Sequence, residues 1–334
     1  MNPLQPTEVC ITVDTEFSIG GNFDNPQLSP IAEPIVLGMV GGQEQGLGFL
    51  LDSFSQFGVK ATFFVEALQT AYFGDEPMGG IARRIAAAGH DVQLHMHPCW
   101  RHYKAIPGQA PNNTKDDSCA GRTDAELDHF FQSGLATFSR WRLPCPVAVR
   151  TGNFQVDANF YRAAARSGIA LSSSIALGVY RPSDERLALE GGRHHIGPVL
   201  ELPVLSYFWP LGHRRRLRSL SITACSGAEL VSVLSAAREL AVSPVIILTH
   251  PQEYVKKKDF RYTNLRRNRV NQARLRAVLQ FLSDNKDEFA TVPISAIAVD
   301  NRDSRADCPA ISVSFRQAMM RMLENGINDR IWWY

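Results

Sequence analysis

Ionisable residues stand at or just beyond the ends of four predicted strands in this sequence. The strands are Val9–Val13, Asp91–Leu94, Val147–Val149 and Val245–Thr249, and the residues that follow them are Asp14, Glu16, His95, His97, Arg150 and His250. The carboxyl ends of parallel strands in a barrel share one face, and active sites are built there. Carboxylates, imidazoles and a guanidinium on one face are typical of a metal-dependent hydrolase site.

The first acidic pair fits such a site. In an extended chain, residues two apart point the same way, so Asp14 and Glu16 can face one cavity. Two close carboxylates repel each other unless a positive charge lies near them, and a divalent metal or Arg150 would supply it. The alternative is an ordinary exposed acidic pair, which the mainly apolar run Val9–Val13 before Asp14 makes less expected.

The second cluster is His95-Met96-His97-Pro98-Cys99. Imidazole is a common ligand of borderline metals, and thiolate also binds zinc. His95 could share an ion with either His97 or Cys99, and the residue types leave both pairs open. We therefore expect a divalent metal, zinc first, with cobalt, manganese, nickel and iron as alternatives. Two histidines with purely structural roles are the competing interpretation.

Predicted strands alternate with predicted helices along the chain. Further strands are expected at Lys60–Val65, Ile169–Ser174, Val199–Val204 and Thr291–Val299; helices are expected at Gly46–Phe57, Gly80–Ala88, Asp124–Trp141, Phe160–Ser167, Ala228–Ala241 and Asn271–Ser283. This order predicts an α/β fold, a distorted (β/α) barrel of about seven parallel strands. The barrel is expected to span residues 1–300. Residues 301–334 are expected to form an appendage with one amphipathic helix, Ser314–Glu324.

Two unpatterned stretches lie beside the predicted site. Phe17–Pro34 follows the acidic pair, and Tyr103–Arg122 follows the histidines. Long loops in compact domains are usually functional or disordered, and their position favours a role in binding substrate.

Composition limits the function classes. A formal net charge of +2 over 334 residues argues against a general polyanion binder, and no DNA-binding motif is visible, so no nucleic-acid partner is expected. Basic residues concentrate at 256–276 and at Arg214–Arg216. Such runs are either solvated surface or contacts for phosphate, an acidic sugar or an anionic membrane surface.

Localisation is inferred from three absences. The six cysteines include no CxxC pair, the N-terminus shows no secretory pattern, and no run of 18 apolar residues exists. We expect a cytoplasmic protein without a transmembrane span, with peripheral association to the inner membrane left open. The sequence does not indicate the oligomeric state.

Six segments in order resemble the NodB-homology polysaccharide deacetylases, carbohydrate esterase family four and its relatives. They are Ile11–Glu16, Lys60–Val65, Gly89–Pro98, Arg150–Phe154, Glu201–Val204 and Ile247–His250. The Leu-His-x-His-Pro pattern is most similar to the WalW-like branch of lipopolysaccharide biosynthesis.

The resemblance implies a metal at the mouth of the barrel and the removal of N-acetyl groups from a sugar or polysaccharide precursor. The basic runs would then hold the phosphate or acidic group of a phosphate-linked or acidic saccharide. It implies Asp14 as general base, Arg150 as the group that orients it, and His250 as general acid. The implied metal ligands are Glu16 and His95, completed by His97 or by Cys99, which stands where the family usually has histidine. That departure keeps an inactive binding or regulatory barrel as an alternative. A hydrolase of non-sugar C–N amide bonds is the other.

Overall fold

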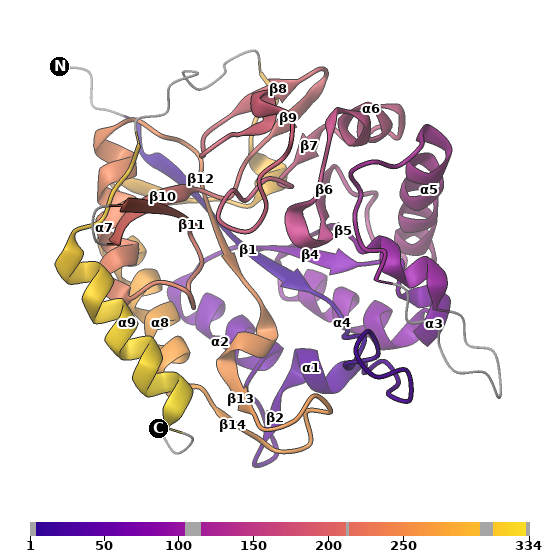
Figure 1. The fold of residues 1–334 in the computed structure, drawn as a ribbon, viewed down its shortest axis with the longest axis horizontal. Coiled ribbons are helices and arrows are strands. Elements are labelled where there is room, and N and C mark those ends of the chain that lie inside the picture. The colour runs from indigo at the N-terminus through magenta and orange to yellow at the C-terminus, as the bar shows by residue number, and fades with distance from the viewer. Residues whose placement is uncertain (1–4, 104–114, 212–213, 301–309, 332–334) are drawn as a thin grey trace.

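A curved sheet forms the centre of the computed structural model, which describes residues 5–103, 115–211, 214–300 and 310–331 (Figure 1). Within the described residues the sheet has nine strands, ordered β12-β1-β4-β5-β6-β7-β9-β8, with β15 paired to β1. The strands are β1 (Thr7–Thr15), β4 (Thr62–Glu66), β5 (Asp91–Met96), β6 (Ala148–Thr151), β7 (Leu171–Ser172), β8 (His194–Ile196), β9 (Val199–Glu201), β12 (Val245–Thr249) and β15 (Phe289–Thr291).

The seven strands from β12 to β9 pair in parallel, and only β8 runs antiparallel to its neighbour in the described sheet. A single parallel bridge between Val204 and Ile246 links the β9 side back to β12. The sheet therefore curls into a nearly closed barrel. The predicted fold class is confirmed.

Alternation along β1 explains how the polar residues reach the inside of the barrel. Val9, Ile11 and Val13 belong to the large core cluster beneath the helices. Cys10 points the other way, into a second apolar cluster to which β4, β6, β7, β9 and β12 also contribute. Side chains two apart share a face, so the inward side continues through Thr12 and Asp14.

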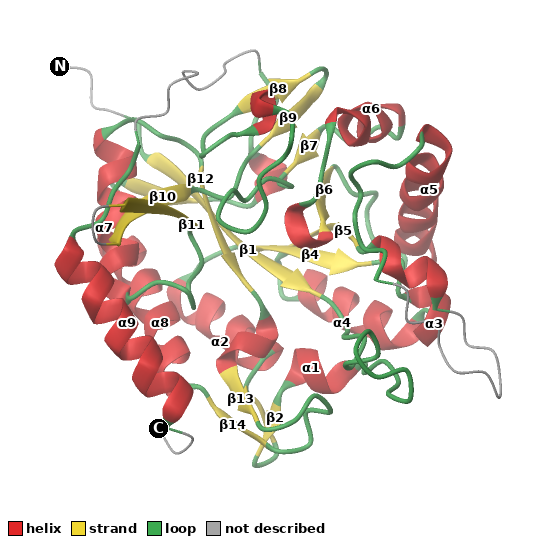
Figure 2. Cartoon of the chain, in the orientation of Figure 1, coloured by secondary structure: helices red, strands yellow, loops and turns green. Residues whose placement is uncertain are grey.

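Helices cover the outside of the sheet (Figures 1 and 2). Those described are α1 (Glu33–Leu37), α2 (Leu47–Phe57), α3 (Thr70–Phe73), α4 (Glu76–Ala87), α5 (Asp124–Arg140), α6 (Ala158–Arg166), α7 (Gly227–Glu239), α8 (Arg269–Asp284) and α9 (Phe315–Arg330). The helix ends follow local sequence signals. Capping boxes of Thr123 with Glu126 and of Ser226 with Glu229 begin α5 and α7, and Gly58 ends α2 at a φ of 64°.

Short elements carry the chain between strands and helices. Three antiparallel hairpins pair β2 (Met39–Val40) with β3 (Gln43–Glu44), β10 (Ser206–Leu211) with β11 (Arg214–Ser219), and β13 (Val255–Lys257) with β14 (Leu265–Arg267). The 3₁₀ turns are η1 (Pro98–His102), η2 (Gly152–Phe154), η3 (Glu185–Leu187), η4 (Pro251–Tyr254) and η5 (Ile294–Ala296).

Three strand predictions are wrong in extent. The strand predicted at 169–174 is limited to the two residues of β7. The strand predicted at 291–299 ends at Thr291, because Pro293 lacks an N–H group and leads into η5 instead. The strand predicted at 199–204 ends at Glu201, since Pro203 interrupts the ladder and leaves Val204 in the isolated bridge. The predicted division into residues 1–300 and 301–334 stays a prediction, and residues 301–309 lie outside the described residues.

Candidate active site

Asp14 and Arg150 form a buried ion pair inside the barrel. Nη1 of Arg150 donates to Asp14 Oδ1 at 2.7 Å and to Thr12 Oγ1 at 2.8 Å. The other guanidinium nitrogens donate to the carbonyl and hydroxyl of Ser173, so the side chain is held on both sides. The guanidinium also lies 4.3 Å from the centre of the Phe64 ring. Fully enclosed in this way, Arg150 fixes the direction of the Asp14 carboxylate.

His250 approaches the other oxygen of Asp14. It follows β12, and its Nε2 lies 3.8 Å from Asp14 Oδ2 while its Nδ1 lies 3.1 Å from Glu253 Oε1. Glu253 is itself held by the Thr249 hydroxyl. Burial alone would lower the pKa of His250, but the carboxylates of Glu253 and Asp14 raise it to about 9. The imidazole is therefore protonated at neutral pH, directly beside Asp14.

Glu16, His95 and His97 bring three donor groups together. Glu16 Oε2 lies 2.6 Å from His97 Nε2 and 3.3 Å from His95 Nε2, and the three ligand atoms fit within 4.8 Å of one another. The strands explain this meeting, because β1 and β5 flank β4 and run in the same direction. One carboxylate and two imidazoles in this arrangement match the donor set of catalytic zinc sites.

The far nitrogens of both histidines are occupied. His95 Nδ1 lies 2.9 Å from the carbonyl of Arg150, and His97 Nδ1 lies 2.6 Å from Asp117 Oδ2. A histidine that donates from Nδ1 keeps its Nε2 lone pair for a metal, and metal-binding histidines usually have such a partner. The carboxylates of Asp117 and Glu16 also favour a positive charge at this position. Burial alone would lower the pKa of His97, but these two carboxylates raise it well above its ordinary value.

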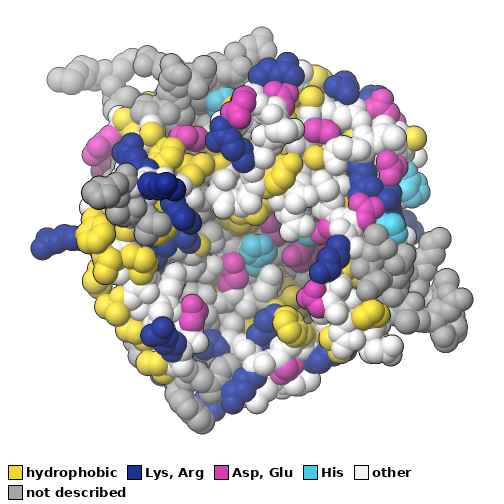
Figure 3. Space-filling model, in the orientation of Figure 1, with side chains coloured by type: hydrophobic (Ala, Val, Ile, Leu, Met, Phe, Trp, Pro, Cys, Tyr) yellow, Lys and Arg dark blue, Asp and Glu magenta, His cyan; other side chains and the backbone are white. Residues whose placement is uncertain are grey.

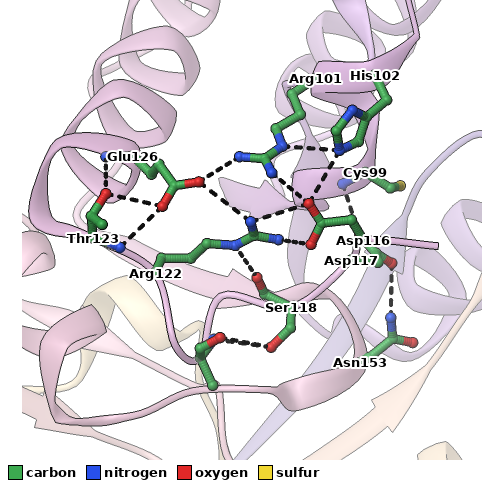
Figure 4. Close-up of polar contacts among 11 residues, drawn as sticks. Cys99, Arg101, His102, Asp116, Asp117, Ser118, Arg122, Thr123, Glu126 and Asn153 are labelled. Atoms are coloured by element: carbon green, nitrogen blue, oxygen red, sulfur yellow. Dashed lines mark hydrogen bonds and ion pairs between the residues drawn. The ribbon is translucent and has the colours of Figure 1, made fainter. Parts of the chain in front are cut away.

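An ionic network holds the loop that supplies Asp117 (Figure 4). Arg101 and Arg122 both bond the carboxylate of Asp116, and both reach Glu126 at the start of α5. Asp117 also accepts from Cys99 N and from Asn153 Nδ2. The loop is thus tied to η1, α5 and η2, which fixes Asp117 against His97.

Gly152 makes room for His97. A Cβ atom at this position would lie 2.2 Å from Nδ1 and Cε1 of the His97 ring. We expect Gly152→Ala to push the imidazole away from Glu16 and to weaken metal binding about 10- to 100-fold, the range for disturbed supporting contacts. Metal affinity measured by competition with a chromophoric chelator checks this. Gly80→Ala is the matched control, since nothing lies within 4 Å of its Cβ position; equal affinity in both variants would contradict the prediction.

A cavity of about 340 Å³ is lined by two of the three donor residues, Glu16 and His97. Its walls come from both predicted binding loops and from the β13–β14 region, and its lining residues include Phe17, Ser18, Phe23, Asp117, Lys257 and Tyr262. Figure 3 shows histidine and acidic side chains together near the middle of the displayed face. The residues 104–114 of the second loop lie outside the described residues.

The structure thus brings six of the predicted site residues to one place, in two adjoining groups. Cys99 belongs to a second group of donor atoms with His97 and Asp117, separate from the group of Glu16, His95 and His97, although it lines the same cavity as Glu16 and His97. Burial and the charge of Asp117 raise the pKa of its thiol, so Cys99 is protonated at neutral pH.

The sequence interpretation did not assign Asp117, Glu253 or Gly152. A signal existed for each: an acidic residue in the loop after the histidines, a glutamate three residues after His250, and a glycine two residues after Arg150.

Of the basic run at 256–276, Lys257 lines the cavity, whereas Arg274 is buried and bonds Glu324. Neither interpretation therefore holds for the whole run, because its residues differ in their surroundings.

Comparisons with known proteins give a likeness of fold. No protein-family model and no curated protein matches the chain. A solved structure from Mycobacterium smegmatis, described as a polysaccharide deacetylase, is 15% identical with a TM-score of 0.51, covering 88% of this chain and 90% of that one. A family 4 carbohydrate esterase from Streptomyces lividans, in complex with acetate, is 13% identical with a TM-score of 0.44, covering 92% of this chain and 99% of that one. The chain therefore has the curled parallel-strand α/β fold of the first of these structures.

Proposed function

We propose that this protein is a metal-dependent hydrolase that removes N-acetyl groups from a saccharide. The observation that carries the proposal is the adjacency of two groups at one barrel mouth. One is the acid–base group of Asp14, Arg150 and His250, and the other is the donor group of Glu16, His95 and His97. The likeness of fold to a structure described as a polysaccharide deacetylase is consistent with it.

Glu16, His95 and His97 are the proposed ligands of a divalent metal. Their donor atoms converge, and the Nδ1 contacts with Arg150 O and Asp117 leave both Nε2 atoms directed at Glu16. A divalent ion here would act as a Lewis acid, lowering the pKa of water and polarising the amide carbonyl. Zinc suits this donor set, and cobalt, manganese, nickel and iron are the alternatives.

The remaining steps belong to the side chains. Asp14, aimed by its bond from Arg150, takes the proton of the attacking water as general base. His250, protonated through its contact with Glu253, donates a proton to the leaving amine. An amide needs this donation, because an unprotonated amide anion is a very poor leaving group. The products are acetate and an amino sugar.

Lys257 suggests an acidic or phosphate-linked substrate. Its side chain lines the cavity with Tyr262, and its Nζ donates to the Tyr262 hydroxyl at 2.9 Å. A cation in the wall of a cavity attracts anionic ligands. The narrower prediction of a WalW-like role in lipopolysaccharide biosynthesis rests on the sequence pattern alone, as does the predicted cytoplasmic location. No described helix has the length and apolar character needed to cross a membrane.

Metal analysis together with an acetate-release assay tests the proposed function. We expect about one transition metal per chain by elemental mass spectrometry, and acetate release from N-acetylated oligosaccharides, faster with acidic than with neutral ones. Bound metal with activity only on non-sugar amides would favour the C–N amide hydrolase. Bound metal with neither activity would favour the inactive binding barrel, and a protein that binds no transition metal would refute the proposal.

The pH dependence tests the role of His250. Activity that needs protonated His250 should fall as the pH rises through about 9. Glu253→Gln removes the carboxylate that raises the pKa of His250 most, so we expect the alkaline limb of kcat/KM to move down by roughly 1–2 pH units. A pH–rate profile checks this, with Glu239→Gln on the exposed end of α7 as control. An unmoved alkaline limb would show that Glu253 does not set this pKa.

A further inference from the structure

Helix α9 has its polar side turned toward the protein. Arg321 is 3% exposed, and its Nε pairs with the fully buried Glu229 of α7 at 3.0 Å. On the same side, Glu324 and Asn325 both accept hydrogen bonds from Nη2 of Arg274, which lies on α8. The helix is therefore attached to the body through ion pairs and hydrogen bonds, and Ala318 is the apolar residue of α9 that is buried in the core.

The outward side of α9 is apolar. Residues four apart share one helix face, and the series 315, 319, 323, 327 continues to Ile331. The exposed members of this face are Phe315 at 59%, Met319 at 46%, Met320 at 53%, Met322 at 38%, Leu323 at 58%, Ile327 at 39% and Ile331 at 44%. Apolar side chains also gather along the edge of Figure 3 where α9 lies. Surface helices normally have the reverse arrangement, so this face is built to contact something apolar.

The charges that accompany this face are positive. Arg316 and Arg330 lie at its two ends, both exposed, and no described carboxylate pairs with either. The acidic residues of α9 are engaged elsewhere: Glu324 pairs with Arg274, and Asp329 interacts with Lys256. Beside the start of the helix, exposed Arg214, Arg215 and Arg216 lie on β11, and Arg215 bonds Ser312 at 2.8 Å.

We propose that the α9 face docks on an anionic lipid surface. An apolar helix face flanked by arginines matches the interfacial arrangement, in which apolar side chains enter the acyl boundary and the guanidinium groups meet the headgroups. A second copy of the chain fits less well. A two-fold contact would place the arginines of one copy against those of the other, and like charges at an interface cost binding energy. This inference does not depend on the proposed function.

Vesicle sedimentation with the full chain tests the proposal. We expect the protein to pellet with vesicles of phosphatidylcholine mixed with phosphatidylglycerol, and not with phosphatidylcholine alone. The double variant Met319→Gln/Leu323→Gln should bind at least about tenfold more weakly. Arg316→Gln/Arg330→Gln should bind on the order of 30-fold more weakly, and high salt should have a similar effect.

Val179→Gln is the matched control, because Val179 is 57% exposed on a turn that is not part of α9. It should bind anionic vesicles as the unmodified protein does, and all variants should keep the same melting temperature. Equal binding by every variant, or no binding to anionic vesicles, would overturn the proposal. A vesicle-free dimer seen by light scattering and lost in Met319→Gln/Leu323→Gln would overturn it in favour of a second copy.

Discussion

Asp14→Asn is expected to lower kcat/KM by about 10²–10⁴-fold, the usual contribution of a general base, with metal content unchanged. The asparagine keeps an oxygen for Arg150 but cannot accept a proton from water. The fold should survive, because Arg150 retains its bonds to the Thr12 hydroxyl and to Ser173 and its contact with the Phe64 ring. Steady-state kinetics of acetate release, together with elemental analysis, provide the measurement.

Asp52→Asn is the matched control for this variant. It makes the same change of aspartate to asparagine at an exposed position on α2, outside the candidate active site. It should have unchanged kinetics. Normal activity in Asp14→Asn would exclude Asp14 as the base. Loss of metal in Asp14→Asn would instead indicate that the acid–base group and the donor group are one unit, contrary to the two roles proposed.

The parallel strands could be predicted because their patterns are local. β1 and β12 are buried strands rich in apolar residues, and the strand predicted at Val245–Thr249 matches β12 at both ends. The shared direction of the Asp14 and Glu16 side chains requires only an extended backbone. Once parallel strands were expected, the meeting of residues from β1, β5, β6 and β12 followed from topology.

The missed elements depend on contacts that no local pattern encodes. The arginine run at 214–216 is exposed, but no strand was predicted there; it begins β11, whose partner β10 contains Trp209 and Pro210. Asp117 lies 20 residues after His97, in a loop without periodicity, and its position is set by the Arg101–Asp116–Arg122 network. The inward direction of the polar side of α9 likewise depends on Glu229 and Arg274, which lie on other helices and pair with it.

His95→Ala is expected to remove the metal and, with it, to lower kcat/KM more than about a hundredfold, since metal-ion catalysis supplies several kcal/mol. The removed imidazole is buried, and the Arg150 carbonyl loses its donor, so we also expect destabilisation of about 1–3 kcal/mol. Elemental analysis separates the two effects, provided that thermal unfolding shows a folded variant. His129→Ala, on the exposed face of α5, should retain both metal and activity.

Cys99→Ala completes this test, because it distinguishes the two ligand sets that the sequence left open. If His97 completes the site with Glu16 and His95, Cys99→Ala should bind metal as tightly as the unmodified protein, since Cys99 has a protonated thiol and is not in the donor group of Glu16, His95 and His97. Loss of metal in Cys99→Ala would mean that binding draws the thiol toward the ion as a thiolate. His97 would then be held by Asp117 as a supporting residue, and the proposed ligand set would be wrong in that one position.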